Sequence, residues 1–521
     1  MAEASVKGGF NLFWGQAISN IIMSLGVIVV TRLLSPSDYG LYTIALTVPA
    51  FITIFRDWGI NTAITRYTAQ YTQEDKPGEV KAILLAGLLF ETILGIALSV
   101  FSVLFSDYIA TSIFNRPNIA PLIQIVSFTI LANAFIAVAQ AAFIGLEKTG
   151  LNSVIMILQA ILKIVLMPTL IILGMGTLGA TIGVTLATLL TGIICIGLLF
   201  RLTKRLQQAN PATKISKIIR VMLTYGLPIS ISAIITGFST NFYNLLMAVY
   251  CTDLMIGNFQ AAVNFSVLIG FFSIPITMIL FPIFSKLDGK KESETLRITF
   301  RFSVKYASLL VVPATIVVIA LAQPAVYTLF GDKYSNAPLY LILLCIPFLY
   351  TALGNLSIGN LLNSQGRTQT TMKLTLANTA IGIPLSLILI PNFQIIGIIA
   401  TNIIATVPSQ LLGLYLIRKK YNATISWRSS ARILTASAAA GAIAYIVTFQ
   451  ISFSSWIKLA LGGTLFIATI ILFLPLTGAI NKADIQNLKE MQKSLGPVQR
   501  ISTPVLDTMQ KLAPRLPTTQ D

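Results

Sequence analysis

The sequence predicts an all-α polytopic membrane protein of about 14 transmembrane helices, arranged as two parallel six-helix repeats plus two C-terminal helices. Three observations predict it. The 521 residues are 55% hydrophobic and only 10% charged, with a mean hydropathy of +0.81, whereas soluble proteins carry about 25% charged residues. Apolar runs of about 20 residues, long enough to cross the hydrocarbon core, recur along the chain. The two halves also match each other.

The apolar runs predict the membrane spans in chain order. Six fall before the segment 201–220, six fall after it, and two follow near the C-terminus. The first six are 10–30, 40–55, 82–105, 119–143, 151–173 and 178–200. The next six are 221–247, 259–284, 302–322, 339–361, 372–390 and 395–417, and the last two are 433–451 and 459–476.

Basic residues predict the orientation of these spans. Segment 201–220 carries six Lys or Arg and no Asp or Glu, and short loops rich in Lys and Arg stay in the cytoplasm. With this segment inside, the predicted outer loops hold only Arg32, Arg116 and Lys333. We therefore expect a multi-pass protein of the cell membrane with both termini in the cytoplasm.

An internal repeat predicts the domain organisation. The tripeptide at 120–122 recurs at 337–339, and Gly179 matches Gly397, at nearly the same offset. An even number of spans in each half gives both halves the same orientation, which is typical of parallel repeats around a central cavity. The predicted parts are an N-terminal bundle (1–200), a basic cytoplasmic linker (201–220), a C-terminal bundle (221–417), two additional transmembrane helices (418–476) and a cytoplasmic tail (477–521).

Composition excludes several kinds of site. The chain has no His, which excludes Ser-His-Asp triads and HExxH zinc sites. Its three Cys are widely spaced, so neither a disulfide framework nor a metal cluster is indicated. We expect no cofactor and no metal. The net charge of +18 comes largely from short loops on one side, so nucleic acid is not an expected partner.

Lys163 is the sharpest candidate for a functional residue. It lies near the middle of span 151–173, where a lysine costs about 2.5–3.5 kcal/mol or more and usually faces a wet cavity or a partner. One interpretation is a cationic site for an anionic substrate, and the other is a structural ion pair. Glu91 lies at a similar depth in its own span, which suggests that it pairs with Lys163 or exchanges a proton during transport.

Further candidates flank the first two spans or lie on the seventh. Arg32, Arg56 and Arg66 could add positive charge to the cavity, and Asp57 is a second candidate for coupling or ion pairing; each could equally be a boundary charge. Polar residues of span 221–247 could line the cavity or hold helices together: Asn241, Tyr243 and Asn244. Lys305, close to the end of its span, is expected to snorkel to the interface. A tail helix over 484–495, with Ile485, Leu488 and Met491 at helical spacing, is expected to lie on the inner leaflet.

The run Thr31–Tyr67, TRLLSPSDYGLYTIALTVPAFITIFRDWGINTAITRY, resembles the amino-terminal signature of the polysaccharide transport family. These proteins are lipid-linked oligosaccharide flippases of the multidrug/oligosaccharidyl-lipid/polysaccharide exporter superfamily. The resemblance implies two six-helix bundles around a cationic cavity, with a polyprenyl-(pyro)phosphate-linked sugar as cargo. It also implies that arginines of the first two spans, here Arg32 and Arg56, line that cavity.

The sequence therefore predicts a transporter, not an enzyme. The expected activity is flipping of a lipid-linked oligosaccharide from the cytoplasmic to the outer leaflet by alternating access, for surface polysaccharide assembly. Membrane lipid and glycan-assembly enzymes are its candidate partners. A cation-coupled drug or metabolite antiporter of the same superfamily is the main alternative. A glycan polymerase and a purely structural membrane protein are less favoured, because the predicted outer loops are too short for a folded domain and Lys163 lies mid-span.

Overall fold

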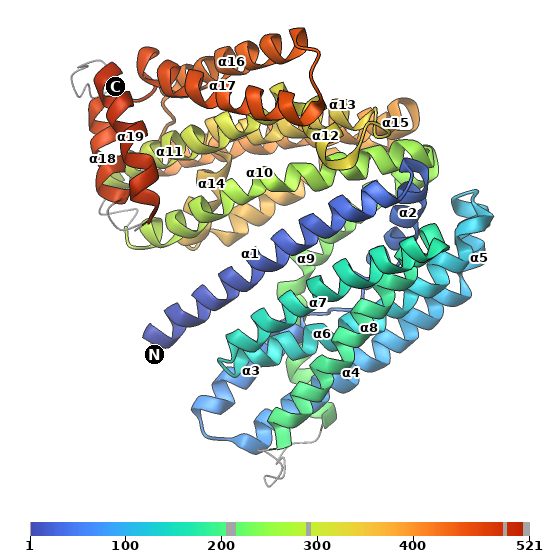
Figure 1. Cartoon of the computed structure of the whole chain (residues 1–521). Coiled ribbons are helices and arrows are strands. Elements are labelled where there is room, and N and C mark those ends of the chain that lie inside the picture. The colour runs from blue at the N-terminus through green and yellow to red at the C-terminus, as the bar shows by residue number, and fades with distance from the viewer. Residues whose placement is uncertain (1, 205–214, 288–292, 493–496, 514–521) are drawn as a thin grey trace. The chain divides into compact units, whose positions relative to one another are not determined.

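The computed structural model describes residues 2–204, 215–287, 293–492 and 497–513 (Figure 1). Over these residues the protein is built from helices and contains no β-strand. The chain divides into two compact units, one comprising 1–260 with 386–398 and the other 261–385 with 399–521.

The first unit contains the helices that carry most candidate site residues. They begin with α1, the first predicted span, and end with α9, the first span after the basic segment. In order they are α1 (Ala2–Leu33), α2 (Pro36–Thr53), α3 (Ile60–Gln73), α4 (Pro77–Leu104), α5 (Ser106–Tyr108), η1 (Ile109–Ile113), η2 (Pro117–Ile119), α6 (Ala120–Gly145), α7 (Thr149–Leu170), η3 (Ile171–Met175), α8 (Gly176–Thr203) and α9 (Ile215–Tyr250).

Two helices, α10 (Asp253–Ser285) and α15 (Thr368–Tyr421), contribute residues to both units. The remaining helices belong to the second unit. They are α11 (Ser293–Ala320), α12 (Ala322–Phe330), α13 (Ala337–Cys345), η5 (Ile346–Leu353), α14 (Asn355–Ser364), α16 (Trp427–Gln450), α17 (Ser455–Leu476), α18 (Lys482–Gln492) and α19 (Pro497–Leu512).

The predicted all-α membrane fold is confirmed, and every predicted span falls on helical chain. By length and composition, nine helices of the described residues could cross a membrane, or ten if the bent pair Ala337–Leu353 and Asn355–Ser364 is one span. Two of the nine, Thr149–Thr203 and Thr368–Tyr421, are 55 and 54 residues long and each is broken, at Gly174 and at Gln394. The count of 14 spans stays a prediction.

The helix breaks at the end of the second predicted span, 40–55. Ser35 starts α2 by accepting a hydrogen bond from the Asp38 amide at 3.1 Å, but α2 ends at Thr53 and the next helix begins only at Ile60. Within the interruption, the Asp57 carboxylate accepts hydrogen bonds from the amides of Gly59, at 2.9 Å, and Asn61, at 3.5 Å. Asp57 thus caps the start of α3.

Helices α7 and α8 form a tight hairpin, side by side in Figure 1. They are joined by the π-helical η3 and a turn with positive φ at Gly174 and Gly176. Gly179 and Gly183, spaced as in a GxxxG motif, face α7: an added Cβ would lie 2.8 Å from the Leu170 carbonyl oxygen and 2.7 Å from the Met167 Cα. Small residues at such positions let two membrane helices approach closely.

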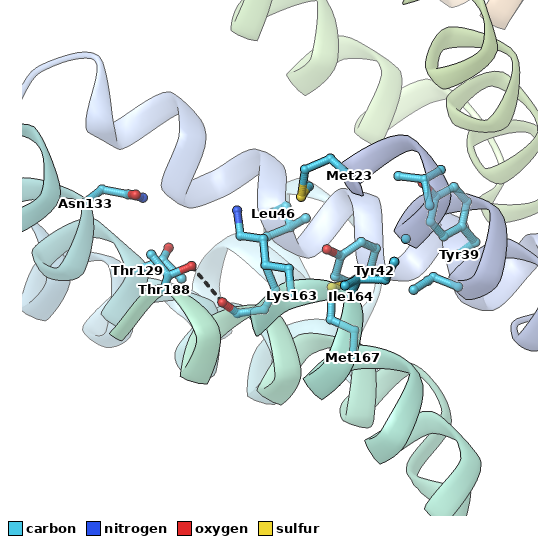
Figure 2. A pocket seen from close by; sticks show the side chains of 14 residues that line it. Met23, Tyr39, Tyr42, Leu46, Thr129, Asn133, Lys163, Ile164, Met167 and Thr188 are labelled. Carbon is cyan, nitrogen blue, oxygen red and sulfur yellow. Dashed lines mark hydrogen bonds between the residues drawn. The ribbon is translucent and has the colours of Figure 1, made fainter. Parts of the chain in front are cut away.

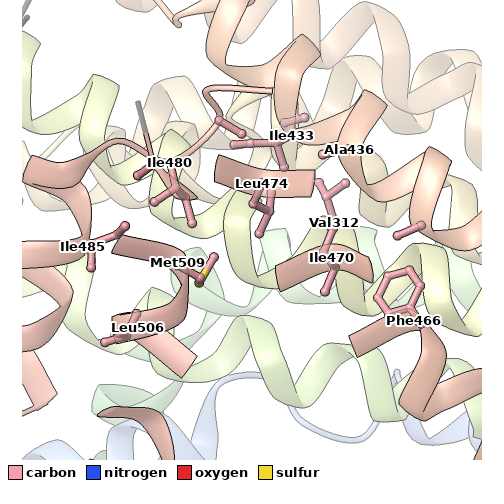
Figure 3. Close-up of a cluster of buried hydrophobic side chains, with 14 of the residues drawn as sticks. Val312, Ile433, Ala436, Phe466, Ile470, Leu474, Ile480, Ile485, Leu506 and Met509 are labelled. Carbon is pink, nitrogen blue, oxygen red and sulfur yellow. The ribbon is translucent and has the colours of Figure 1, made fainter. Parts of the chain in front are cut away.

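The C-terminal tail packs against the second unit. Ile485, which the sequence placed on a membrane-surface helix, is fully buried in a cluster with Leu506 and Met509 of α19, Leu474 of α17 and Ile433 of α16 (Figure 3). The side chains of Leu488 and Met491 lie outside the described residues. The structure therefore corrects the expectation for Ile485: its side chain is not available to a lipid surface.

Lys305 also differs from its expected role. Its Nζ lies 2.5 Å from the Asp484 carboxylate of α18, which is buried, so the lysine does not snorkel to the interface. The predicted domain division stays a prediction, because the compact units group residues by contact while the predicted bundles group them by internal repeat. Most of the predicted linker, 205–214, lies outside the described residues.

Candidate functional site

A cavity of about 300 Å³ lies within the first unit, between α1, α2, α6, α7 and α8 (Figure 2). Apolar residues such as Met23, Leu46 and Met167 form part of its wall. The polar and charged residues that line it are Tyr39, Tyr42, Thr129, Asn133, Lys163 and Thr188. The cavity is therefore amphipathic, with one cationic group and several neutral hydrogen-bonding groups.

Lys163 supplies the charge of this cavity. The side chain is half-buried on α7, 14 residues after the start of the helix at Thr149, and Figure 2 shows its amine among the side chains of the cavity wall. Its Nζ takes part in no hydrogen bond or ion pair with the described part of the chain. Neither Asp nor Glu is among the described residues that line the cavity. The amine is thus placed to meet an anion.

Glu91 has a different partner from the one predicted. Its carboxylate forms an ion pair with Arg56, and its Oε1 accepts a hydrogen bond from Asn61 Nδ2 at 3.0 Å. Glu91 is fully buried and Arg56 is 5% exposed. The predicted pairing of Glu91 with Lys163 is therefore wrong, and a role of Glu91 in proton exchange stays a prediction. The pair ties α4 to the interruption between α2 and α3.

The other predicted residues lie away from this cavity. Arg32, in the last turn of α1, is exposed, and Arg66 on α3 places its guanidinium 4.2 Å from the centre of the Tyr225 ring. Asn241 donates to the Gly237 carbonyl oxygen of its own helix at 2.9 Å. The half-buried side chains of Tyr243 and Asn244 follow on the same helix, α9. The structure does not bring these five residues to Lys163.

Several cavity residues were missed by the sequence reasoning. Asn133 lies mid-span in 119–143, and a polar amide at that position was a usable signal. Tyr39 and Tyr42 fall within the very run that carried the family resemblance, but their aromatic character made them resemble ordinary packing residues. Their ring centroids lie 6.0 Å apart in a stacked arrangement along one wall. Thr188 of α8 completes the polar lining.

Comparison with known proteins identifies the family. Residues 29–339 match the family model described as polysaccharide biosynthesis protein, which is more than half of the chain. The chain belongs to the polysaccharide biosynthesis protein family. The resemblance predicted from Thr31–Tyr67 is confirmed. Residues 229–467 of this family member also match the model of the lipid II flippase MurJ.

A curated relative supports the same family. The lipopolysaccharide biosynthesis protein WzxC of Escherichia coli (strain K12) is 26% identical over 386 residues, which cover 71% of this polysaccharide biosynthesis family member and 73% of the relative. Its similarity extends over most of both chains.

Solved structures share the fold of this polysaccharide biosynthesis family member. One is the lipid II flippase MurJ in an inward closed conformation, with a TM-score of 0.72 and 15% identity, covering 89% of this chain and 98% of that one. Another is an inward-facing multidrug resistance MATE family transporter of the MOP superfamily, with a TM-score of 0.64 and 19% identity, covering 78% and 94%. At these identities the likeness is one of fold.

Proposed function

We propose that this multi-pass membrane protein flips a polyprenyl-(pyro)phosphate-linked oligosaccharide from the cytoplasmic to the outer leaflet by alternating access. The observation that carries the proposal is the cavity around Lys163, an intramembrane amine without an acidic neighbour among the cavity's described lining residues. An ionisable group at this depth marks a substrate or ion pathway by default. A positive charge with neutral hydroxyl and amide groups around it suits a phosphorylated sugar.

The physical task explains why such a cavity is needed. The head of a lipid-linked sugar is polar and charged, and its passage through bare hydrocarbon would leave those groups without hydrogen bonds or counter-charge. Tyr42 and Asn133 offer hydrogen bonds, and Lys163 offers the charge. A volume of about 300 Å³ is at the lower end of the range of small-ligand sites and has room for the phosphate end of the head.

The comparisons agree with this proposal. One similar protein is named for flipping a lipid, and another for lipopolysaccharide biosynthesis. Flipping requires no covalent chemistry, so the proposed protein is a transporter. We further propose that it lies in the cell membrane with both termini in the cytoplasm, and that glycan-assembly enzymes are its partners, because the lipid-linked sugar must be made on one side and used on the other.

The alternative is a cation-coupled drug antiporter, and it is considered because the fold is similar to that of a multidrug resistance transporter. An organic cation needs an anionic or aromatic site. The cavity has two tyrosines, but its one charged lining residue in the described chain is a lysine, and the buried acid Glu91 does not line it and is paired with Arg56. These charges favour the anionic cargo.

The test is flipping of a fluorescent lipid-linked oligosaccharide by the protein in proteoliposomes. We expect Lys163→Met to weaken substrate binding by about tenfold or more, because a hydrogen bond to a charged group contributes about 1.5–3 kcal/mol. Lys163→Arg retains the charge and is expected to retain most of the activity. Lys458→Met, a lysine near the start of α17 in the other unit, is the matched control. Equal flipping by Lys163→Met and the control would contradict the assigned site, and preferential transport of organic cations would support the antiporter.

A further inference from the structure

The second unit contains a separate basic pocket that the proposed transport site does not use. This pocket, of about 370 Å³, is lined by Leu362 of α14, by Arg367 and Thr370 at the start of α15, and by Leu416, Lys419 and Lys420 near its end. Three of its six lining residues are basic, and none of these described residues is acidic. It is therefore a strongly cationic pocket.

Helical spacing explains why the charges face one way. Ile417 and Tyr421, four residues apart, are buried in a hydrophobic cluster with Leu362 of α14. Residues three and four apart lie on one face of a helix, so Leu416, Lys419 and Lys420 share a neighbouring face and line the pocket. The buried face of α15 thus fixes the direction of its basic face.

The opposite wall is held in place by the turn before α15. Gln365 Nε2 donates hydrogen bonds of 2.8 Å to the carbonyl oxygens of Phe284, in the last turn of α10, and Leu287, just after it. These bonds anchor the turn in which Gly366 has a φ of +68° and which leads directly into Arg367. These bonds therefore fix the backbone position of Arg367. The first turn of the long helix α15 adds the partial positive charge of a helix N-terminus to the pocket.

The pocket combines charge with an apolar floor. The side chains of Arg367, Lys419 and Lys420 are exposed, whereas Leu416 is half-buried and Leu362 is 2% exposed. Both pocket walls come from segments that the sequence predicts to face the cytoplasm. Basic pockets between membrane helices on that side bind lipid phosphates. A free phosphate ion has no apolar group that could contact Leu416. A phospholipid has one, because its acyl chains begin close to its phosphate.

From this geometry we propose that the pocket between α14 and the two ends of α15 binds the phosphate headgroup of an anionic phospholipid of the inner leaflet. Arg367 and Lys419 contact the phosphate, Lys420 lies beside them over the Tyr421 ring at 5.7 Å, and the half-buried Leu416 contacts the acyl chains. This site is distinct from the Lys163 cavity, and its occupancy does not depend on what the transporter carries.

The test compares lipid binding by two triple variants of the full chain. Arg367→Gln/Lys419→Gln/Lys420→Gln removes the pocket charges. The control, Lys148→Gln/Arg201→Gln/Lys204→Gln, removes three exposed charges from the corresponding helix ends of the first repeat, outside the pocket. Purified protein in neutral detergent is titrated with phosphatidylglycerol or phosphatidylcholine, and bound lipid is counted by native mass spectrometry.

We expect the pocket variant to lose affinity for phosphatidylglycerol by about tenfold or more, and the control to bind as wild type does. Leu416→Ser, at a half-buried position, should also weaken lipid binding. Three results would overturn the proposal: equal losses in both triple variants, equal binding of phosphatidylcholine, or displacement of the lipid by millimolar inorganic phosphate. None of them bears on flipping by Lys163 variants, so failure here is distinguishable from failure of the proposed function.

Discussion

Replacing Glu91 by glutamine is expected to destabilise the first unit strongly. Glutamine keeps the shape of the side chain but removes its charge, and Arg56 stays protonated. Arg56 is 5% exposed and Glu91 is fully buried, so water cannot compensate the guanidinium. Removing one partner of a buried ion pair costs about 3–5 kcal/mol. We therefore expect Glu91→Gln to lower the free energy of unfolding by about 3 kcal/mol or more.

The chain carries its own reporter for this measurement. Its three cysteines, Cys195, Cys251 and Cys345, are all buried and free, so a thiol-reactive fluorophore labels them only as the protein unfolds on heating. Glu294→Gln is the matched control, because Glu294 pairs with Arg297 at the surface with its side chain 64% exposed. An exposed pair contributes about 0–1 kcal/mol, so the midpoint of this variant should stay near that of the wild type.

A double variant separates two effects of Glu91→Gln: the loss of the ion pair itself, and the cost of leaving the Arg56 charge buried without a partner. Arg56→Met/Glu91→Leu replaces the pair by apolar side chains, a change that is often neutral or stabilising for buried pairs. We expect it to unfold at a higher temperature than Glu91→Gln. If Glu91→Gln and the surface control unfold at the same temperature, or if the double variant is the least stable of the three, the reasoning about a desolvated charge is refuted.

Two further predictions concern packing. Gly226→Val should destabilise the first unit by about 1–3 kcal/mol, because a Cβ at Gly226 would lie 2.4 Å from the Gly59 carbonyl oxygen; an unchanged midpoint in the thiol assay would contradict this close approach. Asp484→Asn should release the tail, because it leaves the Lys305 amine without its counter-charge; we expect faster protease cleavage ahead of α18, and cleavage at the wild-type rate would show that the ion pair does not hold the tail.

The sequence predicted the helices well because their cause is local. Each apolar run is long enough to span a membrane by itself, and the runs at 151–173 and 178–200 end up as α7 and α8. The interruption after Thr53 could not be predicted in the same way, because the buried charge of Arg56 is tolerated there only through a partner on another helix.

The partner of Glu91 shows that the depth of a residue in its span does not predict which residue it contacts. Depth placed Glu91 and Lys163 at similar heights, but it gives neither the rotation of a helix nor its neighbours. In the structure α4 packs against α3, α6 and α9, whereas α7 packs against α1 and α8. Glu91 therefore meets Arg56 and Asn61. Ile485 carries the same lesson, since its helical spacing predicted an apolar face but not whether protein or lipid covers it.

The closely packed hairpin of α7 and α8 affects how the Lys163 cavity can change. Lys163 lies on α7 and Thr188 on α8. These two helices pack closely at Gly179 and Gly183 and are joined by a short turn. We therefore expect these two groups to keep a constant spacing when the cavity changes shape. Any widening or narrowing of the cavity would then come from movement of α1, α2 and α6, which form its other walls. A crosslink between α7 and α8 should therefore leave the transport rate unchanged.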